Sequence, residues 1–243
     1  MYIDAENLTA ESAYKLLIGS VIPRPIAWVS TLSTDGVGNL APISFFTVVG
    51  RKPPMVSLSI QPRSDGVTLK DSFVNMRDTG EFVTHLATLP QALPLHLSAN
   101  EFEPDEDEFD MVGLEKVPSA AVKPPRIAGA PIAFECAVEM IVPSPDGLNH
   151  LVVGRVVQFY VRDDLYLSRG RIDTGAIAPI GRLAAEYTVV DNAFVPPLDR
   201  ETLERFEGRR MERLDKRPDD YSMIETSEWS PSGSVMRPED DAG

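Results

Sequence analysis

The sequence has few of the residues from which many catalytic centres are built. It holds one cysteine, Cys136, and three histidines among 243 residues. A single cysteine excludes an internal disulfide and any metal site made of several cysteines. The histidines (His85, His96 and His150) form no H-x-x-x-H pair, so a zinc hydrolase of that type is not expected. Cys136 lies in an alternating apolar run over 132–138, which predicts a small core residue and not a reactive thiol.

Long apolar runs and familiar nucleotide-binding motifs are absent as well. No apolar stretch approaches the roughly 20 residues that span a bilayer, and no basic region followed by an apolar one opens the sequence. We therefore expect a cytoplasmic protein without membrane association. We find no Walker-type glycine-rich loop, no G-x-S-x-G elbow and no Rossmann fingerprint. A chain with so few side chains suited to acid–base or redox chemistry either only binds a ligand or depends on a cofactor for catalysis.

The formal net charge of −14 is concentrated in two places. Residues 101–110 carry seven acids and no base, and residues 215–243 carry eight acids and three bases. We interpret both as solvated segments, with a cationic partner for the first as the alternative. A basic stripe with interleaved aromatic residues is absent, so nucleic-acid binding is not expected.

Local sequence patterns predict mostly strands. Thr9 is a suitable N-cap for a short helix over 8–18. A second helix is expected over 68–77, because Leu69, Phe73 and Met76 fall on one helical face. Period-two alternation and turn residues predict strands over 26–32, 39–49, 55–60 and 81–87, a hairpin of 132–142 with 150–162, and a last strand near 185–190. Short helical and loop pieces are expected over 91–115.

This pattern is typical of a mainly-β fold. Seven or eight strands follow one another mainly through turns, whereas a parallel sheet needs regular crossover helices. We therefore predict an antiparallel β-barrel with a few flanking helices, in one domain over 1–197. Residues 198–243 are predicted to form a charged helix and then a disordered acidic tail.

Hydroxyl side chains gather on strands that are otherwise apolar. Ser30, Thr31, Ser44, Ser57 and Ser59 lie on neighbouring predicted strands. One interpretation is an ordinary half-exposed sheet face, and the other is a polar platform for a ligand rich in hydrogen-bond acceptors.

A group of charged and hydroxyl residues follows at the predicted start of the second helix. Arg63 precedes it, and Lys70, Asp71 and Ser72 open it. Hydroxyls, free amides and cations at a helix N-terminus suit a phosphate group, although Asp71 and Ser72 alone are also an ordinary helix cap.

Taken together, these segments resemble a known family. The run 24–31 (Arg-Pro-Ile-Ala-Trp-Val-Ser-Thr) and the run 38–46 (Gly-Asn-Leu-Ala-Pro-Ile-Ser-Phe-Phe) resemble the first hairpin of flavin-reductase-like, FMN-binding split-barrel proteins. The resemblance continues in family order over about residues 12–190. Its further elements are Pro53-Pro54-Met55-Val56, Lys70-Asp71-Ser72-x-x-Asn75, His150-x-x-x-Gly154-x-Val156 and Arg182-Leu183 with Tyr187.

The resemblance implies a Greek-key split β-barrel that forms a homodimer, with one FMN near each subunit interface. It implies flavin-ring and ribityl contacts from Ser30, Thr31, Asn39, Ala41, Pro42, Ser44 and Phe45. It implies phosphate contacts from Ser59, Arg63, Lys70, Asp71 and Ser72.

The activity that the resemblance implies is transfer of hydride from NADH or NADPH to flavin. Electrons would then pass to free flavin or to a partner such as a monooxygenase component, and no catalytic acid or base is needed. His150 is the expected nicotinamide or substrate contact, with a structural histidine as the alternative. The family's Gly-Asp-His reads Leu148-Asn149-His150 here, which puts NAD(P)H use in question. Two other functions stay open: a flavoredoxin-like FMN carrier without NAD(P)H turnover, and a non-enzymatic split-barrel binding protein.

Overall fold

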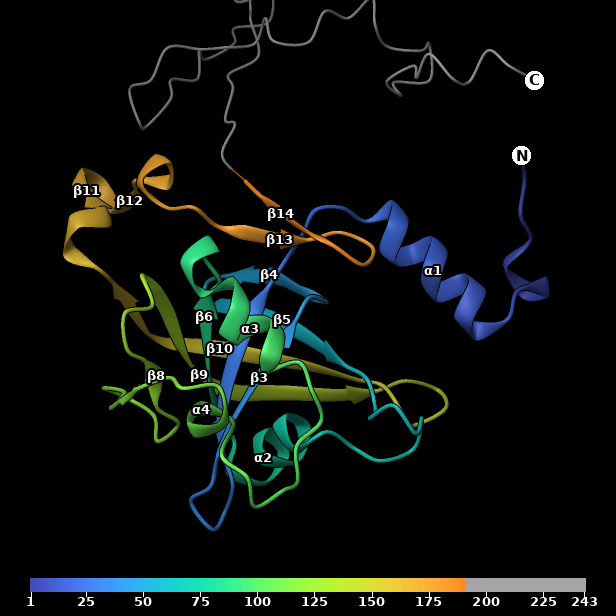
Figure 1. The fold of residues 1–243 in the computed structure, drawn as a ribbon, viewed down its shortest axis with the longest axis horizontal. Coiled ribbons are helices and arrows are strands. Elements are labelled where there is room, and N and C mark those ends of the chain that lie inside the picture. Colours follow the sequence, from blue (N-terminus) through green and yellow to red (C-terminus); the bar gives the residue numbers. More distant parts are fainter. Residues whose placement is uncertain (191–243) are drawn as a thin grey trace, which may run out of the picture.

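The computed structural model describes residues 1–190 of the chain (Figure 1). The predicted helix and acidic tail over 198–243 lie outside the described residues. None of the helices within 1–190 is long and apolar enough to cross a membrane.

A seven-stranded antiparallel sheet dominates the fold, in the order β3-β2-β6-β9-β10-β5-β4. This confirms the predicted mainly-β class. Its strands are β2 (Ala27–Leu32), β3 (Gly38–Ile43), β4 (Phe46–Arg51), β5 (Pro54–Ile60), β6 (Glu81–Leu86), β9 (Ile132–Pro143) and β10 (His150–Val161).

The two edge strands of this sheet, β3 and β4, are consecutive in the chain. Only Ser44 and Phe45 separate them, and the Ser59 N–H donates to the Phe45 carbonyl at 2.8 Å. Because the chain runs directly from one edge to the other, the sheet must curl until its edges meet, which makes a barrel. Register shifts in the β4–β5 and β9–β10 pairs contribute curvature.

The single strand predicted over 39–49 is therefore wrong. β3 pairs with β2, whereas β4 pairs with β5. A strand-like sequence pattern indicates that a segment is extended, but it does not show with which neighbouring strand each part of the segment pairs.

Short strands and helices surround the barrel (Figure 1). The short strands are β1 (Arg24–Pro25), β7 (Lys116–Val117), β8 (Arg126–Ile127), β11 (Tyr166–Leu167), β12 (Arg171–Ile172), β13 (Ile180–Arg182) and β14 (Tyr187–Val189). The helices are α1 (Ala10–Ser20), α2 (Asp71–Thr79), α3 (Ala92–Leu97) and α4 (Glu108–Met111), with 3-10 turns at Ala5–Asn7, Leu89–Gln91, Asp163–Leu165, Ser168–Gly170 and Thr174–Ala176.

The two predicted helices agree with the structure to different degrees. Thr9 caps α1 as expected, with its Oγ1 accepting from the Ser12 N–H at 3.2 Å. The start of α2 falls at Asp71 and not at 68, because the Asp65 carboxylate accepts from the N–H groups of Val67 and Thr68 and holds a turn there.

Two hydrophobic cores share strand β2. Inside the barrel, Phe82 and Leu58 pack with Phe73 and Met76 of α2. On the other side of the sheet, Trp28 packs with residues of β3, α3, α4 and β8. Strand β2 is consequently buried on both faces. Cys136 is a buried member of the first core, as predicted, and burial raises the pKa of its thiol.

Candidate functional site

A groove crosses the junction of β3 and β4 and ends at the start of α2. A cavity of about 110 Å³ lies at the α2 end. It shares Pro42, Ile43 and Lys70 with a second cavity of about 150 Å³. The second shares Ser44, Phe45 and Ser59 with a third of about 480 Å³. Because neighbouring cavities have common walls, they form one elongated groove.

Ten of the twelve predicted cofactor-binding residues line this groove. They are Asn39, Ala41, Pro42, Ser44, Phe45, Ser59, Arg63, Lys70, Asp71 and Ser72. They come from β3, the β3–β4 junction, β5, the segment before α2 and the first turn of α2.

Ser30 and Thr31 are not brought to the groove. Both side chains are fully buried in β2. The Ser30 hydroxyl donates to the Pro125 carbonyl at 2.6 Å, and the Thr31 hydroxyl donates to Asn39 Oδ1 at 3.1 Å. They support the groove from behind, because β2 is covered on both faces.

The start of α2 offers unsatisfied donors to the groove. Lys70 occupies the N-cap position, and no side chain caps the helix. Ser72 is only 1% exposed, and its Oγ has no hydrogen-bond partner within the described chain. Buried hydroxyls are normally paired, and uncapped helix N–H groups with the helix dipole attract anions. This end of the groove is therefore suited to a negatively charged group.

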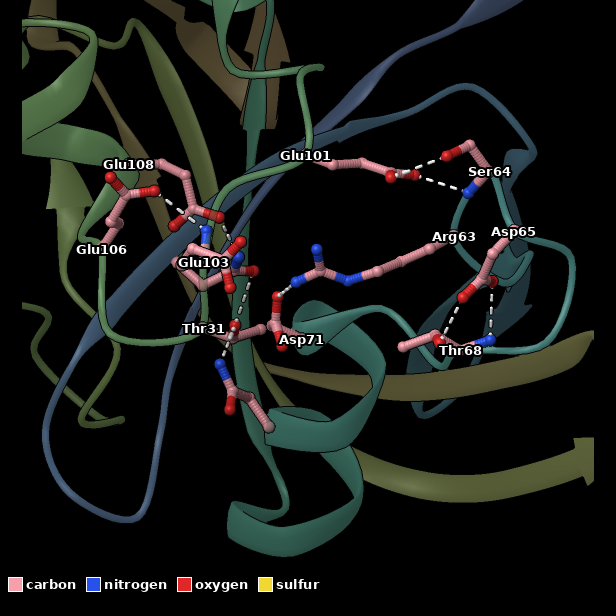
Figure 2. Close-up of polar contacts among 12 residues, drawn as sticks. Thr31, Arg63, Ser64, Asp65, Thr68, Asp71, Glu101, Glu103, Glu106 and Glu108 are labelled. Carbon is pink, nitrogen blue, oxygen red and sulfur yellow. Dashed lines mark hydrogen bonds and ion pairs between the residues drawn. The ribbon is translucent and has the colours of Figure 1, made fainter.

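Two cations lie beside these donors. Arg63 forms an ion pair with Asp71 (Figure 2), and its guanidinium has further N–H donors beyond that pair. Lys70 lines both of the cavities next to α2 and is without an ion-pair partner among residues 1–190. The carboxylate of Asp71 offsets part of this positive charge, so Lys70 and the helix start are the strongest attractions for an anion.

Part of the acidic segment 101–110 forms a wall of the groove (Figure 2). Glu101 accepts from the N–H and hydroxyl of Ser64 at 2.6 and 2.8 Å. Glu108 is 6% exposed and accepts from the Leu40 N–H at 3.3 Å and from the Asn39 amide. Burial, with a smaller contribution from Asp71, raises the pKa of Glu108 to about 7. The interpretation of the whole run as a solvated loop is corrected at Glu108, which is buried, whereas Glu101 is exposed.

Arg24 is a groove residue that the sequence did not assign to the site. It is 5% exposed and donates to the carbonyls of Ile18, Val21 and Leu183 at 2.5, 3.1 and 2.6 Å. Its Nε also donates to the Ser44 hydroxyl at 3.4 Å. It thus ties the end of α1 to the groove. The sequence did hold an indication of this role, because Arg24 lies between two prolines and directly before an apolar strand, where a solvent-facing arginine is not expected.

His150 lies at the start of β10, where it pairs with Ile60 of β5, a residue that lines the second cavity. Its ring stacks on Phe73 of α2 with centroids 3.9 Å apart, and it is not among the residues that line the three cavities. Its contact with a nicotinamide stays a prediction.

The remaining histidines have contacts within the protein. His85 Nδ1 lies 2.8 Å from the Trp28 carbonyl, and its Nε2 accepts from the Ile127 N–H at 3.0 Å. Since Nε2 accepts, the ring is neutral with its proton on Nδ1, and burial lowers the pKa of His85 to about 4. His96 Nδ1 lies 3.3 Å from the Tyr187 hydroxyl. Within residues 1–190 no three His, Cys, Asp or Glu side chains are grouped to hold a metal ion.

Comparisons with known proteins point to flavin chemistry. An uncharacterised protein of Halalkalibacterium halodurans is 38% identical over 208 residues, which are 84% of this chain and 98% of that protein. The crystal structure of nitrilotriacetate monooxygenase component B from Bacillus cereus has a TM-score of 0.76 and 34% identity, covering 80% of this chain and 97% of its own. That of Pseudomonas fluorescens 2-nitrobenzoate 2-nitroreductase has a TM-score of 0.74 and 29% identity, covering 82% and 97%. Residues 18–176 match the flavin reductase like domain, and the chain therefore belongs to the flavin reductase like family.

Proposed function

We propose that the chain is an FMN-dependent oxidoreductase that accepts hydride from NADH or NADPH and passes electrons to free flavin or to a redox partner. The observation that carries the proposal is the α2 end of the groove. There the buried Ser72 hydroxyl, which has no hydrogen-bond partner among residues 1–190, faces one cavity together with Lys70 and the helix start, which no described side chain caps. A phosphate supplies the acceptor oxygens and the negative charge that this group of donors lacks.

The rest of the groove fits the remainder of FMN. Lys70, Ser72 and Arg63 would hold the phosphate. Ser44 and Ser59 offer hydroxyls to a ribityl chain, and Ala41, Pro42 and Phe45 offer apolar surface to a flat ring. When bound, FMN supplies the ring that takes up the two electrons of a hydride. The chain's own residues bind and orient the reactants, which suits a site without a histidine or cysteine on its walls.

Two similar proteins support a redox role, and one of them supports a partner protein. One is a monooxygenase component and the other a nitroreductase by name. By analogy we propose that this chain delivers electrons to a separate oxidising component, with a monooxygenase component as the leading class. Fold alone does not fix such a role, so the partner has to be tested directly.

We also propose that the chain forms a homodimer. Apolar side chains are exposed next to the groove, at the C-terminal end of α1 and on β4. They include Leu17 at 58%, Val21 at 58%, Val48 at 69% and Val49 at 48% exposure. Leu17 and Val21 line the third cavity of the groove together with Ser59. A second copy covering this face would complete the groove, and light scattering after gel filtration should give twice the monomer mass. Replacing Val48 and Leu17 with Asp should then yield monomers with weaker flavin binding.

The direct test is steady-state oxidation of NADH and of NADPH with FMN in excess. Turnover that falls in the Lys70→Ala, Ser72→Ala double variant supports the proposal. Flavin binding without turnover favours the second candidate, an FMN electron carrier. The observation that favours this candidate is the position of His150, stacked on Phe73 and outside the groove. No binding of any flavin refutes both.

A further inference from the structure

A chain of buried hydrogen bonds connects α2 with α4 behind the groove. Asn75 of α2 donates to the Thr31 hydroxyl at 3.0 Å. That hydroxyl donates to Asn39 Oδ1 at 3.1 Å, and the Asn39 amide donates in turn to the Glu108 carboxyl (Figure 2). Asn75, Thr31, Asn39 and Glu108 are each at most 7% exposed. Buried polar groups linked in this way fix one another's orientation.

Glu108 is the acceptor at which this chain ends. Its second oxygen accepts from the Leu40 N–H at 3.3 Å, so the carboxyl holds both the backbone of β3 and the side chain of Asn39. Asn39 and Glu108 also form part of the cavity at the α2 end of the groove. The carboxyl therefore lies in the wall of the cavity that contains Lys70 and Ser72.

The charges around Glu108 are mostly negative. Asp71 faces it from α2 across the cavity, and Arg63, paired with Asp71, and Lys70 line the same cavity. On its own helix, Asp107 and Asp110 pair with Lys116 at 2.6 and 3.3 Å. A neighbouring cavity of about 450 Å³, which Glu108 also lines, brings in Asp35, Asp78, Glu103, Asp105 and Glu106. No ion pair to Glu108 is found within residues 1–190, so a negative charge there is not compensated.

From this arrangement we propose that Glu108 is a positioning residue of the flavin site whose neutral form favours the phosphate-bearing ligand and whose anionic form opposes it. The proposal rests on the proposed function, since it assumes that FMN occupies the groove. A dianionic phosphate at Lys70 and Ser72 would share a cavity of about 110 Å³ with the Glu108 carboxyl. Lys70 and the helix start compensate the phosphate, but the charge on Glu108 has no cation of its own among residues 1–190, and the two negative groups repel each other strongly where little water lies between them.

The pKa of Glu108, near 7 in the free protein, sets the pH at which this repulsion is felt. FMN binding should raise that pKa further, because it adds negative charge nearby. By linkage, binding then takes up a proton above pH 7. The second pKa of the phosphate itself is about 6, so between pH 7 and 8.5 the ligand keeps its charge and Glu108 is the group that changes.

The experiment is a titration of FMN and riboflavin against pH from 7 to 8.5, on the full chain and on Glu108→Gln. Glutamine keeps an acceptor for Asn39 and carries no charge. In the unaltered protein the Kd for FMN should rise by about five- to tenfold per pH unit in this range, whereas that for riboflavin should stay nearly level. In Glu108→Gln the FMN affinity should be level with pH and about thirtyfold tighter than that of the unaltered protein at pH 8.5. Glu103→Gln is the matched control, because Glu103 lines only the neighbouring cavity, and it should keep the pH dependence.

A pH-independent FMN affinity in the unaltered protein, or a slope retained in Glu108→Gln, would overturn the proposal while leaving flavin binding intact. Failure to bind either flavin at any pH would instead overturn the proposed function, and this inference with it. If Glu108→Gln does not fold, calorimetry of the unaltered protein at pH 8 in two buffers of different ionisation enthalpy decides. Net uptake approaching one proton per FMN, and none for riboflavin, supports the proposal; no uptake with FMN refutes it.

Discussion

Replacing Ser72 with alanine should affect stability and binding in opposite directions. Within residues 1–190 the Ser72 hydroxyl is buried and has no hydrogen-bond partner. An unsatisfied buried hydroxyl costs about 1–3 kcal/mol of desolvation. Removing it should therefore leave the free energy of unfolding unchanged or raise it by up to about 1 kcal/mol, which is a rise in Tm of about 2–4 °C for a domain of this size.

With FMN bound, the same hydroxyl is proposed to donate to the phosphate. A hydrogen bond to a charged group contributes about 1.5–3 kcal/mol, so Ser72→Ala should weaken FMN by about 10- to 100-fold. Riboflavin, which lacks the phosphate, should change by less than about twofold. Flavin fluorescence titrations give both affinities, and thermal unfolding without ligand gives the stability.

The matched control is Ser64→Ala. Ser64 lies on the loop before α2, but its hydroxyl is exposed and bonded to Glu101, and it does not line the groove. It should leave both flavin affinities unchanged. Equal losses for FMN and riboflavin in Ser72→Ala would refute the phosphate assignment, and a fall in Tm of several degrees would refute the unsatisfied hydroxyl.

Three further predictions concern the framework of the site. An alanine at position 154 would place its Cβ 2.3 Å from the buried Phe82 ring. Gly154→Ala should therefore lower the free energy of unfolding, measured in urea, by about 1–3 kcal/mol, and adding Phe82→Leu should restore part of this loss. An unchanged free energy of unfolding in Gly154→Ala would contradict this packing. Arg24→Met should lower the free energy of unfolding by about 2–4 kcal/mol, because three carbonyls lose a charged donor. Arg24→Lys should recover little of this stability, and full recovery with lysine would refute the role of the guanidinium geometry. The pKa of His85 is lower in the folded state than in the unfolded state. Its contribution to the free energy of unfolding is therefore complete above pH 6.5 and is lost as the pH falls toward 4, by about 3 kcal/mol in total. Glu108 has the opposite shift and opposes this loss between about pH 4.5 and 7. The urea midpoint of Glu108→Gln should therefore fall more steeply between pH 6.5 and 5 than that of the unaltered protein. Equal slopes would contradict the assignment of Glu108, and a level midpoint in Glu108→Gln would contradict that of His85.

The mainly-β fold could be predicted because its evidence is local. The strands β2, β5 and β6 and the β9–β10 hairpin follow period-two patterns and turn residues in the sequence. The division between β3 and β4 could not be predicted this way. The sequence from Ile43 to Phe46 holds no glycine, asparagine or proline that would mark a turn, and only the long-range pairing with β2 and β5 reveals two strands.

The candidate site was predictable where the residues act through their own chemistry. Lys70 and Ser72 at a helix start, and Ser44 near a strand end, are brought together in one groove, and their contacts with FMN stay a prediction. Ser30 and Thr31 do not, because burial of β2 on both faces depends on α3, α4 and β8, which are remote in sequence.

Glu108 shows most clearly what the sequence alone could not reveal. It is one of seven acids in the run 101–110, and composition describes all seven in the same way. Asp107 caps the short helix α4 by accepting from the Phe109 N–H, and Phe109 is fully buried in the second core. These contacts turn Glu108 toward Asn39, while Glu103 of the same run stays exposed.

The measurement that tests the central claim most directly is an equilibrium titration of FMN fluorescence with the purified full chain, with riboflavin in parallel. We predict saturable quenching at one FMN per chain, with FMN bound at least about tenfold more tightly than riboflavin, since only FMN reaches Lys70 and Ser72 with a phosphate. Absence of quenching at high protein concentration, or equal affinity for the two flavins, would contradict the account.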